Sequence, residues 1–250
     1  MGIDLTWWLL PALAVVAFLY ASVGHAGASG YIAVLALVGL PASTIKPLAL
    51  GLNLVVAAQG SLQFWRAGHL DWRLFWPLLL SGLPAAYLGG WLNLPAIWFE
   101  HLVALVLLAS AARFLTHTHD PSPLQKPRLL ELMLTGSGLG LLAGLTGTGG
   151  GVFLTPLLLL RGWATTRQAA ALSSVFIFGN SCAGLIGLLV TRQGAGIGSP
   201  ASIGWMLLVV LGAGAVGSRL GSHHWPVAAM RRILAVVLVL AAWKLLHTTS

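Results

Sequence analysis

The stretch Gly144-Leu145-Thr146-Gly147-Thr148-Gly149-Gly150-Gly151 decides how this chain folds. It lies between two apolar runs and contains five glycines in eight residues. Each glycine costs a helix about 1 kcal/mol relative to alanine, so a regular helix should break here. Glycine also lets the backbone turn freely and approach a neighbouring helix or a ligand closely. A weaker copy, Gly24-His25-Ala26-Gly27-Ala28-Ser29-Gly30-Tyr31, lies near the N-terminus, so we expect two halves, each built around one such break.

The composition is that of a membrane protein. Hydrophobic residues make up 58% of the 250 residues and charged residues only 7%, whereas soluble domains carry about 25% charged residues. Several apolar runs approach or exceed the length of about 20 residues that a bilayer-spanning helix needs. The net charge of +8 is explained by basic residues in cytoplasmic loops. The expected partner is therefore the lipid bilayer and not nucleic acid, and the fold class is an all-α polytopic membrane protein.

Ten apolar segments follow from the hydropathy pattern, five on each side of one long polar link. They are residues 5–24, 27–40, 47–65, 73–92 and 96–115 in the first half, and 129–146, 150–161, 167–191, 202–221 and 226–247 in the second. The sequence thus predicts an N-terminal repeat (1–115), a link (116–128) and a C-terminal repeat (129–250). Internal repeats around interrupted helices are typical of secondary transporters.

The second segment of each half, 27–40 and 150–161, is unusually short. A helix of this length rises only about 20 Å, while the hydrocarbon core of a bilayer is about 30 Å thick. Each segment therefore either shares the crossing with its glycine-rich stretch or re-enters the membrane. The distribution of basic residues distinguishes these two topologies.

If all ten segments cross, one side of the membrane holds ten basic residues and the other side three. The first group is Arg66, Arg73, Arg113, Lys126, Arg128, Arg161, Arg167, Arg219, Arg231 and Arg232, and the second is Lys46, Arg192 and Lys244. If the short segments re-enter, the count becomes seven against six. The positive-inside rule thus predicts ten crossings, with the link in the cytoplasm and both termini outside. Five segments per half is an odd number, so the repeats would be inverted.

The glycines divide into two kinds. Small residues recur at a spacing of four within apolar segments, which is the pattern that lets membrane helices pack closely. They are Gly136, Gly140 and Gly144, Ala86 with Gly90, and Gly217 with Gly221. The run from Gly147 to Gly151 instead enters a short helix. Backbone N–H groups at such a helix start favour an anion, and irregular backbone at membrane depth is tolerated where it is buried or lines a cavity. We therefore expect this run to line a substrate site.

Polar residues in the third segment of each half complete the candidate site. They are Asn53, Gln59 and Ser61 in the first half, and Ser173, Ser174, Asn180 and Ser181 in the second. Polar groups at membrane depth usually face the bundle interior or a transport pathway, and interhelical hydrogen bonding is the alternative role. His25 lies in the first glycine-rich stretch and can offer a donor or a proton site. The predicted substrate-binding residues are His25, Gly27, Asn53, Gly147, Gly149, Gly150, Gly151, Ser173 and Ser174.

These motifs resemble a known family. The run from Gly144 to Pro156, with Gly162 and the stretch Ala171-Leu172-Ser173-Ser174, resembles the signature of the TauE/SafE sulfite exporter family. The first half shows the matching pattern in Gly39-Leu40-Pro41, Leu50-Gly51-Leu52-Asn53 and the stretch from Arg66 to Arg73. The resemblance implies a secondary transporter, an exporter, of a small sulfur-containing anion such as sulfite, sulfoacetate or an organosulfonate. It also implies the bacterial inner membrane.

Other functions stay open on the sequence alone. An anion channel of the same architecture, or an uptake permease for a different small anion, would fit the same pattern. An enzyme is not expected, because no catalytic constellation is evident. No cofactor or metal is expected either: His117, His119 and Asp120 lie in the link, where we interpret them as a solvated loop. A homodimer is one possible assembly.

Overall fold

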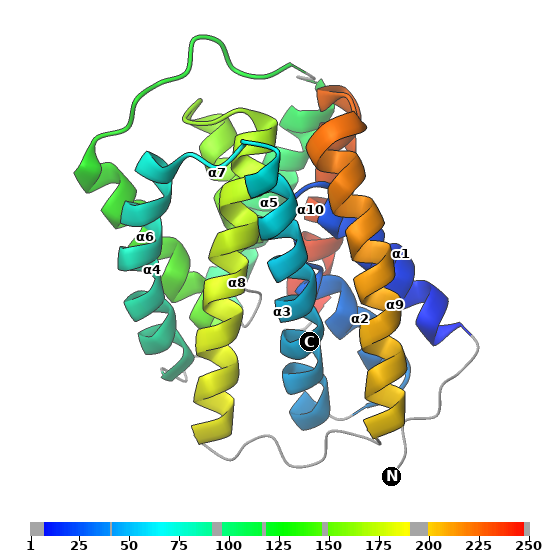
Figure 1. The fold of residues 1–250 in the computed structure, drawn as a ribbon. Helices are drawn as coiled ribbons and strands as arrows, with labels where there is room; N and C mark the ends of the chain where they lie inside the picture. The colour runs from blue at the N-terminus through cyan, green and yellow to red at the C-terminus, as the bar shows by residue number, and fades with distance from the viewer. Residues whose placement is uncertain are drawn as a thin grey trace.

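A computed structural model describes residues 8–40, 42–91, 97–116, 119–146, 150–190 and 200–247, and within this part the chain is helical without strands. The first half contains α1 (Leu9–Ser22), α2 (Ala28–Leu37), α3 (Ala42–Arg66), α4 (Trp72–Trp91) and α5 (Ile97–Thr116). The second half contains α6 (Leu129–Thr146), α7 (Gly151–Leu160), α8 (Thr166–Val190), α9 (Pro200–Arg219), the π-helix η1 (Leu220–His224) and α10 (Val227–His247). Figure 1 shows these elements as one bundle.

The expected segments match these helices closely, with one clear difference. We began the third segment at Pro47, but α3 begins five residues earlier, at Ala42, and contains Pro47. Pro47 is the sixth residue of α3, beyond the first four N–H groups that have no partner within a helix, so its ring removes one i to i−4 hydrogen bond. The expected short segments are both present as helices of ten residues, α2 and α7.

The helices of the two halves also pair with one another in a regular way. The most extensive packing joins α4 to α6, α1 to α9, α3 to α8, and α5 to α10. Each helix has an equivalent at the same position in the other half, so that α1 corresponds to α6 and α4 corresponds to α9. Exchanging equivalent helices converts the α1–α9 pair into the α6–α4 pair. The same exchange leaves the α3–α8 and α5–α10 pairs unchanged.

Contacts along the paired helices give their directions. Asn53 of α3 meets Ser181 of α8, and Gly60, seven residues later, lies beside Ser174, seven residues earlier. The two long helices α3 and α8 are therefore antiparallel, as Figure 1 shows at the centre of the bundle.

Glycines bring the other pairs into close contact. A Cβ added at Gly136 or Gly140 of α6 would overlap the backbone of α4, at Leu78 and Gly82 respectively. Likewise, a Cβ at Gly217 would overlap the carbonyl of Phe18 in α1. The prediction that these glycines serve helix packing is confirmed.

Several of the segments that join consecutive helices lie at one end of the bundle. The turn between α3 and α4, the link residues 119–128 and the turn between α7 and α8 all lie at the top of Figure 1. His69, in the turn between α3 and α4, has its Nε2 2.9 Å from the carbonyl oxygen of Ser222 in η1. The N–H of Gln125 in the link donates to the carbonyl oxygen of Gly162, in the turn between α7 and α8, at 2.8 Å. The end of α8 and the start of α9 lie at the opposite end.

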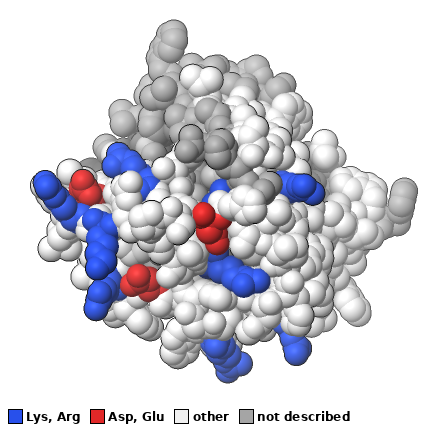
Figure 2. Space-filling view, turned by 90° about the horizontal axis from the view of Figure 1, so that it is seen from above, with Lys and Arg blue, Asp and Glu red and all other residues white. Residues whose placement is uncertain are grey.

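Basic side chains gather at the end that carries the link. Figure 2, which looks onto this end, shows Lys and Arg side chains spread across it. Arg66 ends α3, while Arg73 and Arg167 lie in the first turns of α4 and α8. The described basic residues at this end belong to the larger group of the sequence count.

The described link residues 119–128 are mostly exposed, as expected of a solvated loop, but Asp120 is partly buried and makes specific contacts that the sequence did not predict. Asp120 Oδ1 accepts hydrogen bonds from the backbone and hydroxyl of Thr166 at 2.8 and 2.5 Å. It also pairs with Arg231 Nη2 at 3.4 Å. Arg231 is buried and its guanidinium lies over the ring of Phe114. The link is thereby fastened to the starts of α8 and α10.

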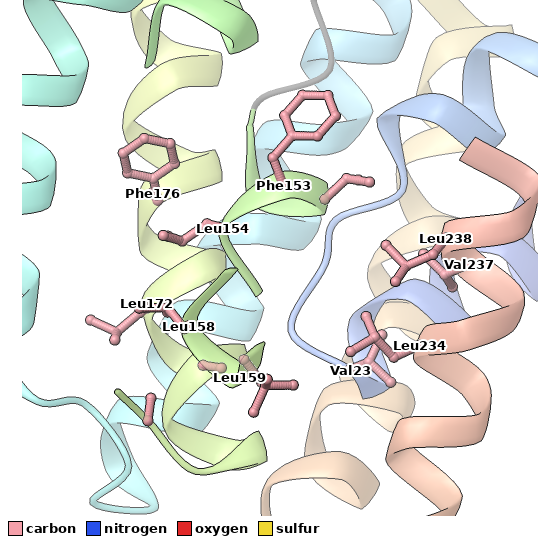
Figure 3. Close-up of a cluster of buried hydrophobic side chains, with 14 of the residues drawn as sticks. Val23, Phe153, Leu154, Leu158, Leu159, Leu172, Phe176, Leu234, Val237 and Leu238 are labelled. Atoms are coloured by element: carbon pink, nitrogen blue, oxygen red, sulfur yellow. The ribbon is translucent and has the colours of Figure 1, made fainter. Parts of the chain in front are cut away.

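Helix length and hydropathy alone identify two helical segments, Pro47–Arg66 and Ala201–His224, that could cross a membrane within the described residues. The short helix α7 is different, because eight of its ten residues are buried. Figure 3 shows Phe153, Leu154 and Leu158 of α7 among apolar side chains of α8 and α10. Neighbouring helices therefore enclose α7.

Candidate functional site

The two short helices begin in the same way. Gly27 is the N-cap of α2 with φ of 101°, and Gly150 is the N-cap of α7 with φ of 76°. Both values lie in the left-handed region, where a side chain is strained and glycine is not. Both helices start inside the protein, since Ala28 and Gly151 are buried. We call residues 23–27 the first break and residues 147–150 the second break, of which the structure describes Gly150.

The first break packs against the start of α7 and against α8. The hydroxyl of Ser174 lies 3.0 Å from the carbonyl oxygen of Gly24, and a Cβ at Gly24 would overlap the backbone of Ala170. The buried ring of His25 lies beside the backbone of Gly151. The first residue of α7 thus meets the first break, which brings together chain segments more than 120 residues apart.

An asparagine stands at the start of each short helix. Asn53 Oδ1 accepts the backbone N–H of Ala28 at 3.0 Å, and its Nδ2 donates to Ser181 Oγ at 2.9 Å. At the other break, Asn180 Nδ2 would stand 3.3 Å from a Cβ placed on Gly150. Each asparagine comes from the long helix that follows the short one, so α3 and α8 both reach a helix N-terminus.

The serines of α8 are buried and bonded within the protein. Ser173 Oγ and Thr155 Oγ1 of α7 lie 2.6 Å apart. Ser174 Oγ is within hydrogen-bonding distance of both Gly24 O and Ala170 O. These hydroxyls, like the amide of Asn53, fix the positions of the breaks in the conformation observed.

Two polar side-chain atoms near the first break lack such partners. His25 Nε2 and Tyr31 Oη are buried and have no hydrogen bond within the described part of the chain. Tyr31 stands one helical turn after the N-cap, and its ring is 3.0 to 3.2 Å from a Cβ placed on Gly27. Leaving a buried donor or acceptor unsatisfied typically costs about 1–3 kcal/mol. Such atoms need a partner that the described part of the chain does not supply, such as water or a ligand.

The structure brings most of the predicted site residues together. His25, Gly27, Asn53, Gly150, Gly151, Ser173 and Ser174 all lie at or beside the two breaks. Gly147 and Gly149 lie outside the described residues. Sequence reasoning missed Tyr31 and Thr155. Tyr31 could have been noticed because it is the last residue of the first glycine-rich stretch, whereas Thr155 carries no distinctive signal.

Comparison with known proteins fits this arrangement. The model of the family described as "Sulfite exporter TauE/SafE" matches residues 9–245. The chain belongs to this family. It is also 39% identical over 243 residues to "Probable membrane transporter protein y4hK" of Sinorhizobium fredii (strain NBRC 101917 / NGR234), covering 95% of this chain and 97% of that protein. No solved structure matches the chain.

Membership of the TauE/SafE family, together with the likeness to a probable membrane transporter, makes this protein a membrane-embedded transporter. The family is one of transporters and not of enzymes. The helical bundle, with its two breaks buried among long helices, is consistent with this role. The predicted family resemblance is confirmed over nearly the whole chain.

Proposed function

We propose that this TauE/SafE protein is a secondary transporter that exports a small sulfur-containing anion, such as sulfite, sulfoacetate or an organosulfonate, across the bacterial inner membrane. The observation that carries the proposal is the meeting of the two breaks. There the first residue of α7 lies beside His25, and two buried polar atoms, His25 Nε2 and Tyr31 Oη, have no partner in the described part of the chain.

The groups at the point where the two breaks meet are suited to binding an anion. Helix N-termini present N–H groups and the positive end of the helix dipole, and both favour negative charge. A single helix start would be weak evidence, but here two buried and unpartnered side chains stand beside it. An oxyanion of sulfur can accept hydrogen bonds from several donors at once.

The proposed site residues have two kinds of role. His25 and Tyr31 would contact the anion, with the backbone of Gly27, Gly150 and Gly151, and of Gly147 and Gly149 if the whole second break takes part. Asn53, Ser173 and Ser174 hold the breaks in the observed conformation. In another transport state their hydroxyl and amide groups would become available to the substrate.

We further propose that the halves, 1–115 and 129–250, are inverted repeats joined by the link 116–128. A two-fold axis perpendicular to a helix reverses the direction of its copy, whereas an axis parallel to the helix preserves it. The antiparallel run of α3 against α8, and the exchange symmetry of the helix pairs, support the perpendicular axis. Inverted repeats give a transporter two similar states with access to opposite sides.

The distribution of basic residues supports an orientation of the protein in the membrane. Several basic side chains lie across the end of the bundle that carries the link, and such residues favour the cytoplasmic side. We therefore propose a cytoplasmic link and both termini outside.

Flux measurements on purified protein test this function. In liposomes containing the protein, uptake of radiolabelled sulfite should saturate with concentration and be reduced by unlabelled sulfite or sulfoacetate. An anion channel would instead pass current that does not saturate at modest concentration. Uptake that requires a different anion would support a permease of another specificity.

A further inference from the structure

We propose that His25 binds a proton together with the substrate anion, so that proton and anion move through this transporter in the same direction. The inference rests on the proposed function and deepens it, because it names the coupling ion and the atom that holds it. The atom is Nε2 of the imidazole, at the point where the first break meets the start of α7.

The hydrogen bond made by Nδ1 of His25 determines whether the other ring nitrogen, Nε2, can take this proton. His25 Nδ1 lies 3.2 Å from the carbonyl oxygen of Val23. A carbonyl oxygen only accepts, so Nδ1 carries hydrogen and donates it. In the neutral ring the other nitrogen, Nε2, then holds a lone pair.

A lone pair at Nε2 cannot bind an anion. It can bind one only after it has taken a proton, because Nε2–H then donates a hydrogen bond and the ring becomes positively charged. Since Nε2 is buried and has no partner in the described part of the chain, the anion and the proton each favour the binding of the other. Linkage of this kind is reciprocal.

Few other ionisable groups stand near the ring. Within the helices packed around the first break, α1 and α2 contribute Tyr20 and Tyr31, and α7 contributes none. In α3 and α8 the ionisable residues are Lys46, Arg66, Arg167 and Cys182, and in α10 they are Arg231, Arg232, Lys244 and His247. The helices α9 and η1, which pack against α1, add Arg219, His223 and His224. Tyr20 is hydrogen-bonded to Ser29 at 2.9 Å.

The buried arginine, Arg231, does not contact the described residues of either break. Arg231 contacts Thr166 and Asp120 at the link end of the bundle. Taking an isolated anion out of water is expensive unless an opposite charge accompanies it. Of the described side chains that are buried at the breaks, His25 is the basic one, so its proton supplies that charge.

The transport step is balanced in atoms and charge. Nε2 takes a proton from water on the side from which the anion enters, and the N–H then donates to an anion oxygen. On the other side the anion leaves and Nε2 returns its proton to water. With one proton, a monovalent anion crosses with no net charge and a divalent anion such as ionised sulfoacetate crosses with one negative charge. The direction of flux follows the sum of the proton and anion gradients, so export requires an outward anion gradient that exceeds any inward proton gradient.

Calorimetry on the full-length protein tests the proposal. Sulfoacetate is titrated into the detergent-solubilised protein at pH 7 and pH 8, in Hepes and in Tris, whose different ionisation heats report the protons taken up. Its acid groups are already ionised at these pH values, so any proton belongs to the protein. Sulfite is titrated as a second anion, and the protons that sulfite itself releases or takes up are subtracted from the total.

The parent should take up close to one proton per anion at pH 8, and its affinity should fall up to tenfold from pH 7 to pH 8. His25→Gln keeps a neutral donor, so it should bind more weakly, take up no proton and show no dependence of affinity on pH. The control His223→Gln changes an exposed histidine of η1, next to Ser222, which contacts the turn between α3 and α4, and it should behave like the parent. Tyr31→Phe should bind more weakly yet still take up the proton.

Anion binding by the parent without proton uptake at either pH would overturn the coupling and leave the proposed function standing. The same conclusion follows if His25→Gln still takes up a proton as the parent does. If neither sulfoacetate nor sulfite binds the parent, the proposed function fails and the coupling fails with it. The parent measurements decide the matter even if His25→Gln does not fold.

Discussion

Asn53 of α3 donates a hydrogen bond of 2.9 Å to Ser181 of α8, and thereby joins the two long helices near their middle. The same amide accepts the N–H of Ala28 at the start of α2. One side chain thus connects three helices and both halves of the transporter. Its surroundings are buried, so water does not replace these bonds when they are lost.

Asn53→Ala should lower both stability and substrate affinity. Each lost hydrogen bond that leaves a buried partner unsatisfied costs about 1–3 kcal/mol. The measurements are the melting temperature in detergent and the concentration of sulfite that half-saturates uptake.

Ser61→Ala is the matched control for Asn53→Ala. Ser61 lies on the same helix, and its hydroxyl bonds to Ala57 of that helix, so its removal should change both quantities little. If Asn53→Ala melts and transports like the parent, the amide does not organise the breaks.

Gly150→Val should abolish transport. The residue has a φ of 76°, and an added Cβ would lie 2.8 Å from Ala143 Cβ and 2.9 Å from Phe176 Cε1. Strain of about 1–3 kcal/mol for a non-glycine residue at such angles adds to the overlap. Radiolabelled uptake and melting temperature measure the effect.

Gly212→Ala serves as the comparison, because a Cβ there meets nothing within 4 Å. In the interior of α9 this change should be neutral or stabilise the helix by about 1 kcal/mol. A Gly150→Val protein that folds and transports normally would show that the second break needs no close approach.

Asp120→Asn should lower the melting temperature. The carboxylate accepts two hydrogen bonds from Thr166 and pairs with the buried guanidinium of Arg231. Neutralising it weakens bonds to a charged group, which are typically worth about 1.5–3 kcal/mol each when buried, and less here because Asp120 is partly exposed.

Asp71→Asn is the control for Asp120→Asn, since Asp71 bonds only locally, to the N–H of Arg73, at an exposed position. It should melt like the parent. Equal melting of Asp120→Asn and the parent would mean that the link is not fastened through this carboxylate.

Much of the helical pattern was predictable from the sequence because the apolar runs and glycine stretches are strong local signals. Gly27 and Gly150 marked the helix starts. The start of α3 was less well predicted, because proline commonly marks the first turn of a helix, whereas Pro47 lies five residues after the start of α3.

The partners of the site residues could not be predicted. The sequence indicated that Asn53 and Ser174 face the interior, but not that they bond to Ala28 and Gly24, because those contacts depend on how distant helices pack. For the same reason the pairing of Asp120 with Arg231, 111 residues away, was missed.

Labelling of introduced cysteines tests the proposed orientation. In a Cys182→Ser background, a cysteine replacing the exposed Ser122 of the link should be protected in intact cells and should react with an impermeant maleimide only after lysis. A cysteine replacing Thr248 should react in intact cells. The reverse pattern would place the link outside.

Uptake of radiolabelled sulfite by liposomes containing the purified protein tests the central claim most directly. The account predicts saturable uptake that unlabelled sulfite or sulfoacetate inhibits and that falls at least tenfold when both His25→Ala and Tyr31→Phe are introduced. Uptake no greater than that of protein-free liposomes, or a double variant that transports like the parent, would contradict it.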